Sequence, residues 1–241
     1  MESVTAITET QTHAAIHRWR EPLICCDSVW EENYARFETP EQEIRKFTRR
    51  FRQVGAGKWS SDSRILDLFC GRGNALKALE RMGFHRLEGV DLSERLLAQY
   101  SGPARLYVGD AADLKLDDGC VDIVVVQGGL HHLPTLESDL EKVLSEIHRV
   151  LKTDGRFVLI EPWETLFLKV IHSMCERPTL RRTWGKLEAL AAMIEQEKQS
   201  YFHWLSRPDF VLTTLSKFFV PQLRTISWGK LQFVGRKLTN L

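Results

Sequence analysis

The chain has 241 residues, enough for one α/β domain with a well-buried core. Its 33 basic and 32 acidic residues leave a formal charge of +1, which offers no broad basic face to nucleic acid. The five cysteines are scattered and odd in number, the N-terminus has no signal-like pattern, and no apolar run approaches the ~20 residues of a membrane helix. We therefore expect a reduced, cytoplasmic protein with no transmembrane segment and no metal site.

Residues 1–58 are expected to form an N-terminal helical cap. Its first part is polar and predicts little regular structure, and a helix is then predicted from Pro40 to about Val54. Just before that helix, three aromatic residues recur at helical spacing: Trp30, Tyr34 and Phe37. Tyr34 either closes over a bound ligand or packs, with the other two, onto the core.

Residues 59–162 alternate between short apolar strands and helical stretches. Strands are predicted at about residues 64–69, 87–90, 104–108, 121–126 and 156–160. The run 121–126 is continuously β-branched, as in a central strand buried on both faces. Repeated strand–helix alternation predicts a doubly wound, Rossmann-like parallel sheet with helices on both faces.

Residues 163–221 change to a helical, aromatic-rich texture and are expected to form a substrate or lid segment. An apolar stripe runs along its start: Trp163, Phe167, Val170, Ile171 and Met174. The stripe is expected to be buried core, and the alternatives are a lid over an apolar acceptor or a surface that leans on a membrane. Residues 222–241 predict an antiparallel hairpin, in which Gly229 separates Gln222–Trp228 from Lys230–Lys237.

The first predicted strand of the core runs through an acid into a glycine-bearing turn. It reads Ile65-Leu66-Asp67-Leu68-Phe69-Cys70-Gly71-Arg72-Gly73, and the next strand ends in a second acid, Asp91. This layout suits a ribose and an adenine lying across the ends of adjacent parallel strands. The acid before the glycines and the missing third glycine disfavour a pyrophosphate, and with it an NAD-type dehydrogenase. The expected ligand is an adenosyl group without phosphates, for which S-adenosylmethionine is the natural candidate.

These residues together resemble the class I S-adenosylmethionine-dependent methyltransferases, and within them the small-molecule, type 11-like subgroup. The resemblance covers about residues 64–162 by motif and the terminal hairpin by pattern. It implies a seven-stranded, mostly parallel sheet whose last strand is antiparallel. It also implies that residues 1–241 form a single methyltransferase domain, with residues 59–162 as its cofactor-binding core.

The resemblance implies a role for each acid at the sheet edge. Asp67 would lie near the amino group of the cofactor or a bound water, Asp91 would accept hydrogen bonds from both ribose hydroxyls, and Asp110 would accept one from the adenine amino group. The other implied cofactor-binding residues are Phe69, Gly71, Gly73, Leu92, Ala111 and Gln127. Among these, Phe69 stands where the family usually has its first glycine, which leaves the shape of the methionine pocket open.

The loop Gly128–Pro134 follows the fourth core strand and should lie over the crevice beside the glycine turn. His131 in this loop is the candidate general base, because histidine titrates near neutrality. The alternative is that the pair of His131 and His132 is a structural feature of the family, with one ring packed under the sheet edge. Glu161 is expected either to hold a polar group of the substrate or to cap the following helix, and Trp163 is a candidate substrate contact.

The expected function is transfer of a methyl group from S-adenosylmethionine to a small organic acceptor, at oxygen, with general-base help from His131. Three alternatives stay open: a macromolecular acceptor (protein or RNA), a lipid-like acceptor, and a non-catalytic cofactor-binding scaffold. Nucleic acid is disfavoured by the balanced charge. It is also disfavoured because no Asn/Asp-Pro-Pro-aromatic tetrad follows the fourth strand.

Overall fold

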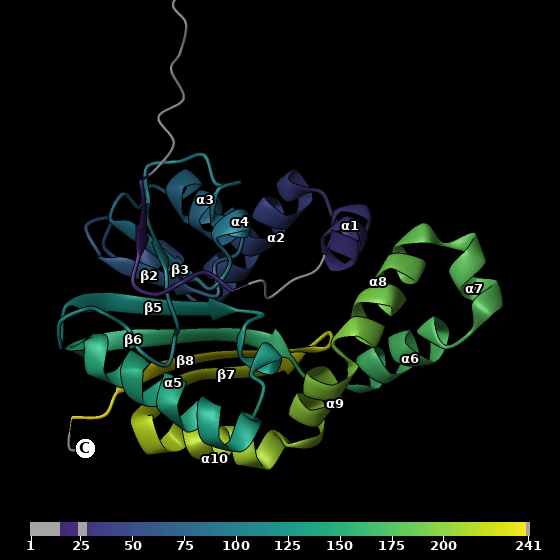
Figure 1. Ribbon diagram of the computed structural model, residues 1–241. Coiled ribbons are helices and arrows are strands. Elements are labelled where there is room, and N and C mark those ends of the chain that lie inside the picture. The colour runs from purple at the N-terminus through teal and green to yellow at the C-terminus, as the bar shows by residue number, and fades with distance from the viewer. Residues whose placement is uncertain (1–14, 24–27, 240–241) are drawn as a thin grey trace, which may run out of the picture.

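The computed structural model describes residues 15–23 and 28–239, and it contains one mixed sheet flanked by helices (Figure 1). The predicted packing of Trp30 concerns a side chain outside the described part. The strands are β1 (Ile16–Arg18), β2 (Ile65–Leu68), β3 (Leu87–Asp91), β4 (Arg105–Val108), β5 (Val121–Gln127), β6 (Leu151–Pro162), β7 (Phe219–Ser227) and β8 (Lys230–Lys237). Their order across the sheet is β1-β4-β3-β2-β5-β6-β8-β7.

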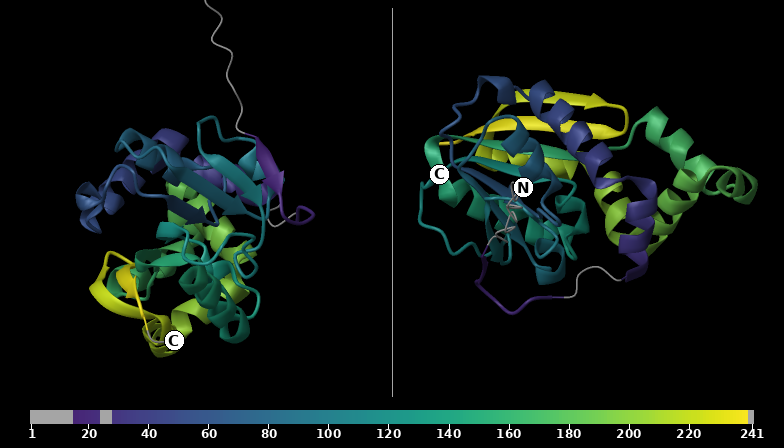
Figure 2. Two further views of the ribbon diagram at one scale, coloured as in Figure 1. Left: turned by 90° about the vertical axis from the view of Figure 1, so that its left-hand side faces the viewer. Right: turned by 90° about the horizontal axis from the view of Figure 1, so that it is seen from above.

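The strand directions confirm the predicted fold class. Strands β1 to β6 pair in parallel, whereas the last strand, β8, runs antiparallel to both β6 and β7. The seven predicted strands correspond to β2–β8, and β1 is an additional eighth strand at the border opposite the hairpin (Figure 2). The sequence did not predict β1, because three residues are too short to show a periodic pattern.

The helices are α1 (Ser28–Phe37), α2 (Pro40–Gln53), α3 (Asn74–Arg81), α4 (Glu94–Leu97), α5 (Leu136–Val150), α6 (Leu166–Cys175), α7 (Pro178–Thr183), α8 (Gly185–Gln196), α9 (Lys198–Ser206) and α10 (Pro208–Phe218). Two 3-10 turns lie at Ala56–Lys58 and Leu130–His132. Helix α2 begins where predicted because Thr39 and Gln42 form a reciprocal capping box and Pro40 fits the first turn.

Side-chain alternation along the central strands builds two separate cores. On β5, Val124 and Val126 join the core formed with α5, α9 and α10, whereas Ile123 and Val125 face α2 and α3. The same alternation holds along β2 and β6, since successive strand residues point to opposite faces. The sheet is thus buried on both sides, as the β-branched run predicted.

Helices α6, α7 and α8 extend beside the sheet as an arm, and α1 packs against α8 (Figure 1). The prediction that the stripe at the start of this segment is buried core is wrong for Phe167 and Val170, whereas Ile171 and Met174 are partly buried against the cluster that α6 forms with α8. Trp163 is buried, but Phe167 is 44% and Val170 is 58% exposed, because α8 covers only the opposite side of α6. In the described part of the chain, no helix has both the length and the apolar character needed to cross a bilayer.

The terminal hairpin turns at Trp228 and Gly229. Both residues have positive φ, 49° and 74°, as a two-residue type I′ turn requires. Trp228 is 77% exposed and meets the ring of Phe167 edge-on at 5.3 Å. Strand β7 begins at Phe219, earlier than predicted, because Phe219 and the next residue already pair with the end of β8.

Candidate functional site

The register of the sheet brings the predicted acids to one edge. Leu68 of β2 is paired with Val90 of β3 and with Val126 of β5, so these strands end at the same level. The pairing of Asp91 with Val108 extends this edge to β4. The carboxyl ends of four parallel strands therefore meet there, as expected for a ligand site in an open α/β sheet.

The glycine turn after β2 uses left-handed backbone at three residues. Phe69, Gly71 and Gly73 have φ values of 58°, 53° and 74°. A Cβ on Gly73 would clash with the ring of Tyr100, so packing requires this glycine. A Cβ on Gly71 would meet nothing within 4 Å, and the backbone there is open to a ligand.

Phe69 is the departure from the family pattern, and a second glycine accommodates it. A Cβ placed on Gly129 would lie 2.5 Å from the Phe69 ring. Gly129 belongs to the loop after β5 that carries His131. The Phe69 ring therefore packs directly against the loop with the candidate base, which the sequence could not show.

Two buried polar atoms at the edge have no hydrogen-bond partner among the described residues. One is Oδ2 of Asp67, whose side chain is only 1% exposed, and the other is Nε2 of Gln127. Burial, and then the charge of Asp91, raise the pKa of Asp67 well above its usual value. The Oε1 atom of Gln127 accepts a hydrogen bond from Arg50 at 3.3 Å. The edge thus offers one unpaired acceptor and one unpaired donor.

The Asp91 carboxylate already holds two backbone N–H groups. Oδ2 accepts from Gly71 and Oδ1 from Ser93, both at 2.8 Å. Burial raises the pKa of Asp91, and these N–H groups act in the opposite direction. A carboxylate offers about four lone-pair sites, so each oxygen retains capacity for a hydroxyl donor.

An N-terminal segment covers the edge at Asp110 and Leu92. Arg20 forms an ion pair with Asp110 at 2.8 Å, and the N–H of Leu23 donates to the carbonyl of Leu92 at 3.0 Å. The other oxygen of Asp110 accepts from the backbone of Ala112 at 2.9 Å. Arg20 and Leu23 were missed by sequence reasoning, because they lie in a polar stretch with no periodic pattern.

His131 is held by a fully buried carboxylate at the end of β6. Its Nδ1 lies 2.7 Å from Oε2 of Glu161, and Oε1 of Glu161 accepts from the N–H groups of Gly129 and Leu130. The prediction that Glu161 caps the following helix is wrong, since Thr165 caps α6. Glu161 instead fixes the loop and orients the His131 ring.

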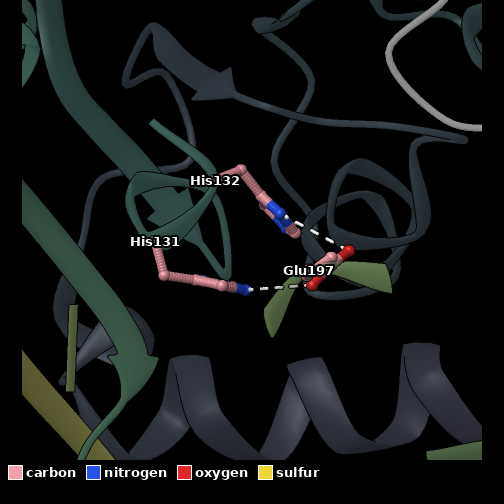
Figure 3. Close-up of side chains that lie close together, drawn as sticks. All are labelled: His131, His132 and Glu197. Atoms are coloured by element: carbon pink, nitrogen blue, oxygen red, sulfur yellow. Dashed lines mark ion pairs between the residues drawn. The ribbon is translucent and has the colours of Figure 1, made fainter. Parts of the chain in front are cut away.

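His132 and Glu197 lie on the other side of the His131 ring (Figure 3). Nε2 of His131 is 3.9 Å, and Nδ1 of His132 is 3.5 Å, from the two carboxylate oxygens of Glu197. Desolvation by the surrounding protein, and then the charge of His131, lower the pKa of His132, although 36% of its side chain is exposed. Glu197 lies at the junction of α8 and α9, and nothing in the sequence distinguishes it from the other acids there.

The remaining predicted residues divide between site and core. The guanidinium of Arg72, in the glycine turn, lies 4.7 Å from the ring of Tyr34, so α1 reaches the turn. Trp163 is buried and packs edge-on against Trp204. Sequence reasoning also missed Lys230, the first residue of β8. Burial lowers the pKa of its ammonium group to about 7.

Comparison with known proteins identifies the family. A family model described as a methyltransferase domain matches residues 66–159. A demethylmenaquinone methyltransferase of Lactiplantibacillus plantarum is 30% identical over 170 residues, covering 57% of this chain and 70% of that protein. The chain belongs to the class I S-adenosylmethionine-dependent methyltransferases.

Two further proteins show how far the likeness to other methyltransferases extends. An uncharacterized methyltransferase of Synechocystis is 35% identical over 105 residues, which are 42% of this chain but 48% of that protein. The chain thus spans about half the length of that relative. The crystal structure of the PH0226 protein from Pyrococcus horikoshii matches with a TM-score of 0.64 at 20% identity, over 88% of this chain and all of that one. This structure supports the fold.

The unpaired atoms at the edge fit the cofactor of the family. The amino-acid end of S-adenosylmethionine carries an ammonium group and a carboxylate. An ammonium donor would satisfy the buried Oδ2 of Asp67, and a carboxylate would accept from Nε2 of Gln127. The residues of this methyltransferase therefore suit the cofactor at its methionine end.

We expect Gly129→Ala to destabilise the methyltransferase by about 1–3 kcal/mol, because its methyl group would overlap the Phe69 ring. Chemical denaturation measures the change in the free energy of unfolding. The same substitution in a Phe69→Gly background should cost much less, since both the ring and the Cβ that would lie 2.6 Å away are gone. Equal costs in the two backgrounds would show that the contact is not responsible.

We expect Asp67→Asn to raise the thermal midpoint of the ligand-free protein and to weaken binding of S-adenosylhomocysteine at least tenfold. The raised pKa of Asp67 means that its ionised form opposes folding. The increase in stability that asparagine brings is largest at a pH above the pKa of Asp67 in the folded protein. It shrinks as the pH falls toward about 3.9, the pKa of an aspartate in an unfolded chain. Calorimetry and pH-dependent melting measure both effects, and a lowered midpoint at neutral pH contradicts the assignment.

Proposed function

We propose that this methyltransferase moves the methyl group of S-adenosylmethionine to an oxygen of a small organic acceptor. The observation that carries the proposal is the buried Glu161–His131 pair, in which Glu161 at the end of β6 holds the histidine of the loop that follows β5 and Gln127. A sulfonium methyl is already activated, so the protein has to align the acceptor and exclude water. A hydroxyl acceptor also has to lose a proton, which is the step that a base assists.

The hydrogen bonds around His131 fix which nitrogen can act. Oε2 of Glu161 accepts a hydrogen bond from Nδ1–H of His131, so the Nε2 lone pair is available to take the proton of an acceptor hydroxyl. The carboxylate of Glu197, 3.9 Å from Nε2, would stabilise the imidazolium that this transfer creates. In this proposal Glu161 positions the ring and His131 moves the proton.

A lipid-like acceptor is the second candidate. The Lactiplantibacillus relative is named for methylating demethylmenaquinone, which gives a precedent for such a compound. The exposed apolar residues Phe167 and Val170 on α6, with Trp228 at the hairpin turn, would suit contact with an apolar acceptor. A macromolecular acceptor has no comparable support.

The decisive experiment combines binding and turnover on the purified full chain. Calorimetric titration with S-adenosylmethionine, S-adenosylhomocysteine and NAD tests the cofactor, with micromolar binding expected for the first two only. Hydroxylated aromatic acceptors and quinols are then offered with methyl-labelled cofactor. Cofactor binding with no labelled product from any acceptor class would favour the scaffold alternative.

Asp91→Ala should weaken binding of S-adenosylhomocysteine at least tenfold. The carboxylate is expected to accept both ribose hydroxyls, and a hydrogen bond to a charged group contributes about 1.5–3 kcal/mol. Calorimetry measures the affinity. Asp113→Ala is the matched control, because that carboxylate pairs only with the exposed Lys115 in the described structure. Unchanged affinity in the Asp91 variant would remove this residue from the site.

His131→Ala should lower turnover by about 10²–10⁴-fold and leave cofactor affinity within a few-fold. His203→Ala is the control, because His203 forms an exposed pair with Glu137 at 3.0 Å. Glu161→Gln should also lower turnover, since the amide no longer favours the required tautomer. Near-normal turnover of His131→Ala with bound cofactor means that this histidine is structural.

A further inference from the structure

Three potential metal ligands converge beside the proposed acceptor position. His131 and His132 come from the 3-10 turn after β5, whereas Glu197 comes from the start of α9 (Figure 3). One ligand atom from each residue lies within 4.8 Å of the other two. Segments far apart in the sequence thus bring two imidazoles and one carboxylate to one point.

We propose that His131, His132 and Glu197 form a binding site for a single divalent transition-metal ion of the zinc type. Two histidines and one glutamate are a known ligand set for catalytic zinc, which leaves a fourth position for water or substrate. Ligands about 2.1 Å from a tetrahedral ion lie about 3.4 Å apart. Nε2 of His131 and Nδ1 of His132 lie 3.9 and 3.5 Å from different oxygens of Glu197, and the three ligand atoms lie within 4.8 Å of one another, so side-chain rotation has to draw them together to reach this geometry.

The surroundings of both imidazoles match those of metal-bound histidines. Histidine ligands commonly donate their second ring nitrogen to a carboxylate or a backbone carbonyl. His131 has Glu161 on Nδ1 at 2.7 Å, which directs Nε2 toward Glu197. His132 interacts with the backbone of Gly128, and the two rings lie 4.0 Å apart. The His131 ring is therefore fixed on the side away from the common point, and the His132 ring packs beside it.

The local charges favour a divalent cation over a protonated histidine pair. Glu161 and Glu197 flank the two imidazoles, and an ion between them would be neutralised by two carboxylates. Lys230 is the cation that acts on His132 from β8, and its effect opposes metal binding. Because Lys230 is one charge against two carboxylates, the balance still favours the ion.

The consequence for catalysis rests on the proposed function, although ion binding does not. An acceptor hydroxyl bound at the fourth position would lose its proton to water more readily, because a metal ion lowers the pKa of a bound hydroxyl. The oxygen would then attack the methyl carbon as the carbon–sulfur bond breaks. In this state Nε2 of His131 is a ligand, and the ion replaces it as the group that makes the oxygen nucleophilic.

The site is tested by titrating the chelator-treated full chain with Co²⁺ and monitoring the visible absorption of the bound ion. Zn²⁺ is then added to displace the Co²⁺. We expect one equivalent to bind with a tetrahedral-type spectrum. His132→Ala and Glu197→Gln should each weaken binding at least tenfold. The matched control is His203→Ala, which removes a surface histidine–glutamate pair and should leave the affinity unchanged.

The proposal is overturned if Co²⁺ does not bind stoichiometrically. It is also overturned if the wild type and both site variants bind Co²⁺ with equal affinity, because the ion would then be held by other ligands. S-adenosylhomocysteine is titrated into the same samples. Cofactor binding without metal binding defeats the metal site alone. Metal binding without cofactor binding defeats the proposed function alone. Retained cofactor affinity in Glu197→Gln shows that this variant is folded.

Discussion

The candidate site depends on one buried carboxylate. Glu161 is fully buried at the end of β6, and it accepts hydrogen bonds from two backbone N–H groups and from His131. These contacts fix the loop after β5, which in turn meets the Phe69 ring through Gly129. A charge placed in such a position is tolerated only when it is fully bonded. The glycine turn and the histidine loop are therefore positioned by the same interaction.

The sequence predicted the parts of this protein that depend on local pattern. Residue spacing and turn chemistry predicted the alternating strands, the acids at the strand ends and the hairpin at Gly229. The observed sheet has these strands and this hairpin. The sequence did not predict Arg20 or Glu197, because each reaches the edge from a segment distant in the chain. The exposed face of α6 was missed for a related reason: an apolar stripe does not say whether a neighbouring helix covers it.

Phe69 shows how a family motif can change without loss of the fold. A bulky residue in left-handed backbone carries a steric cost that glycine avoids. The Phe69 ring packs against Gly129, because the missing side chain of this glycine leaves the space that the ring occupies. The two residues lie 60 positions apart and meet only because β2 and β5 are neighbours. The absence of a side chain at Gly129 thus leaves room for the Phe69 ring on the facing loop.

Strand β1 has a second effect, on how the sheet meets other molecules. An unpaired outer strand is a template for pairing with another chain. The three residues of β1 pair with the outer side of β4, so the border of the sheet becomes a short strand that carries the charge of Arg18. The same segment continues to Arg20 over Asp110. Displacement of this segment from Asp110 and β4 would therefore expose unpaired N–H and C=O groups of β4 at the border of the sheet.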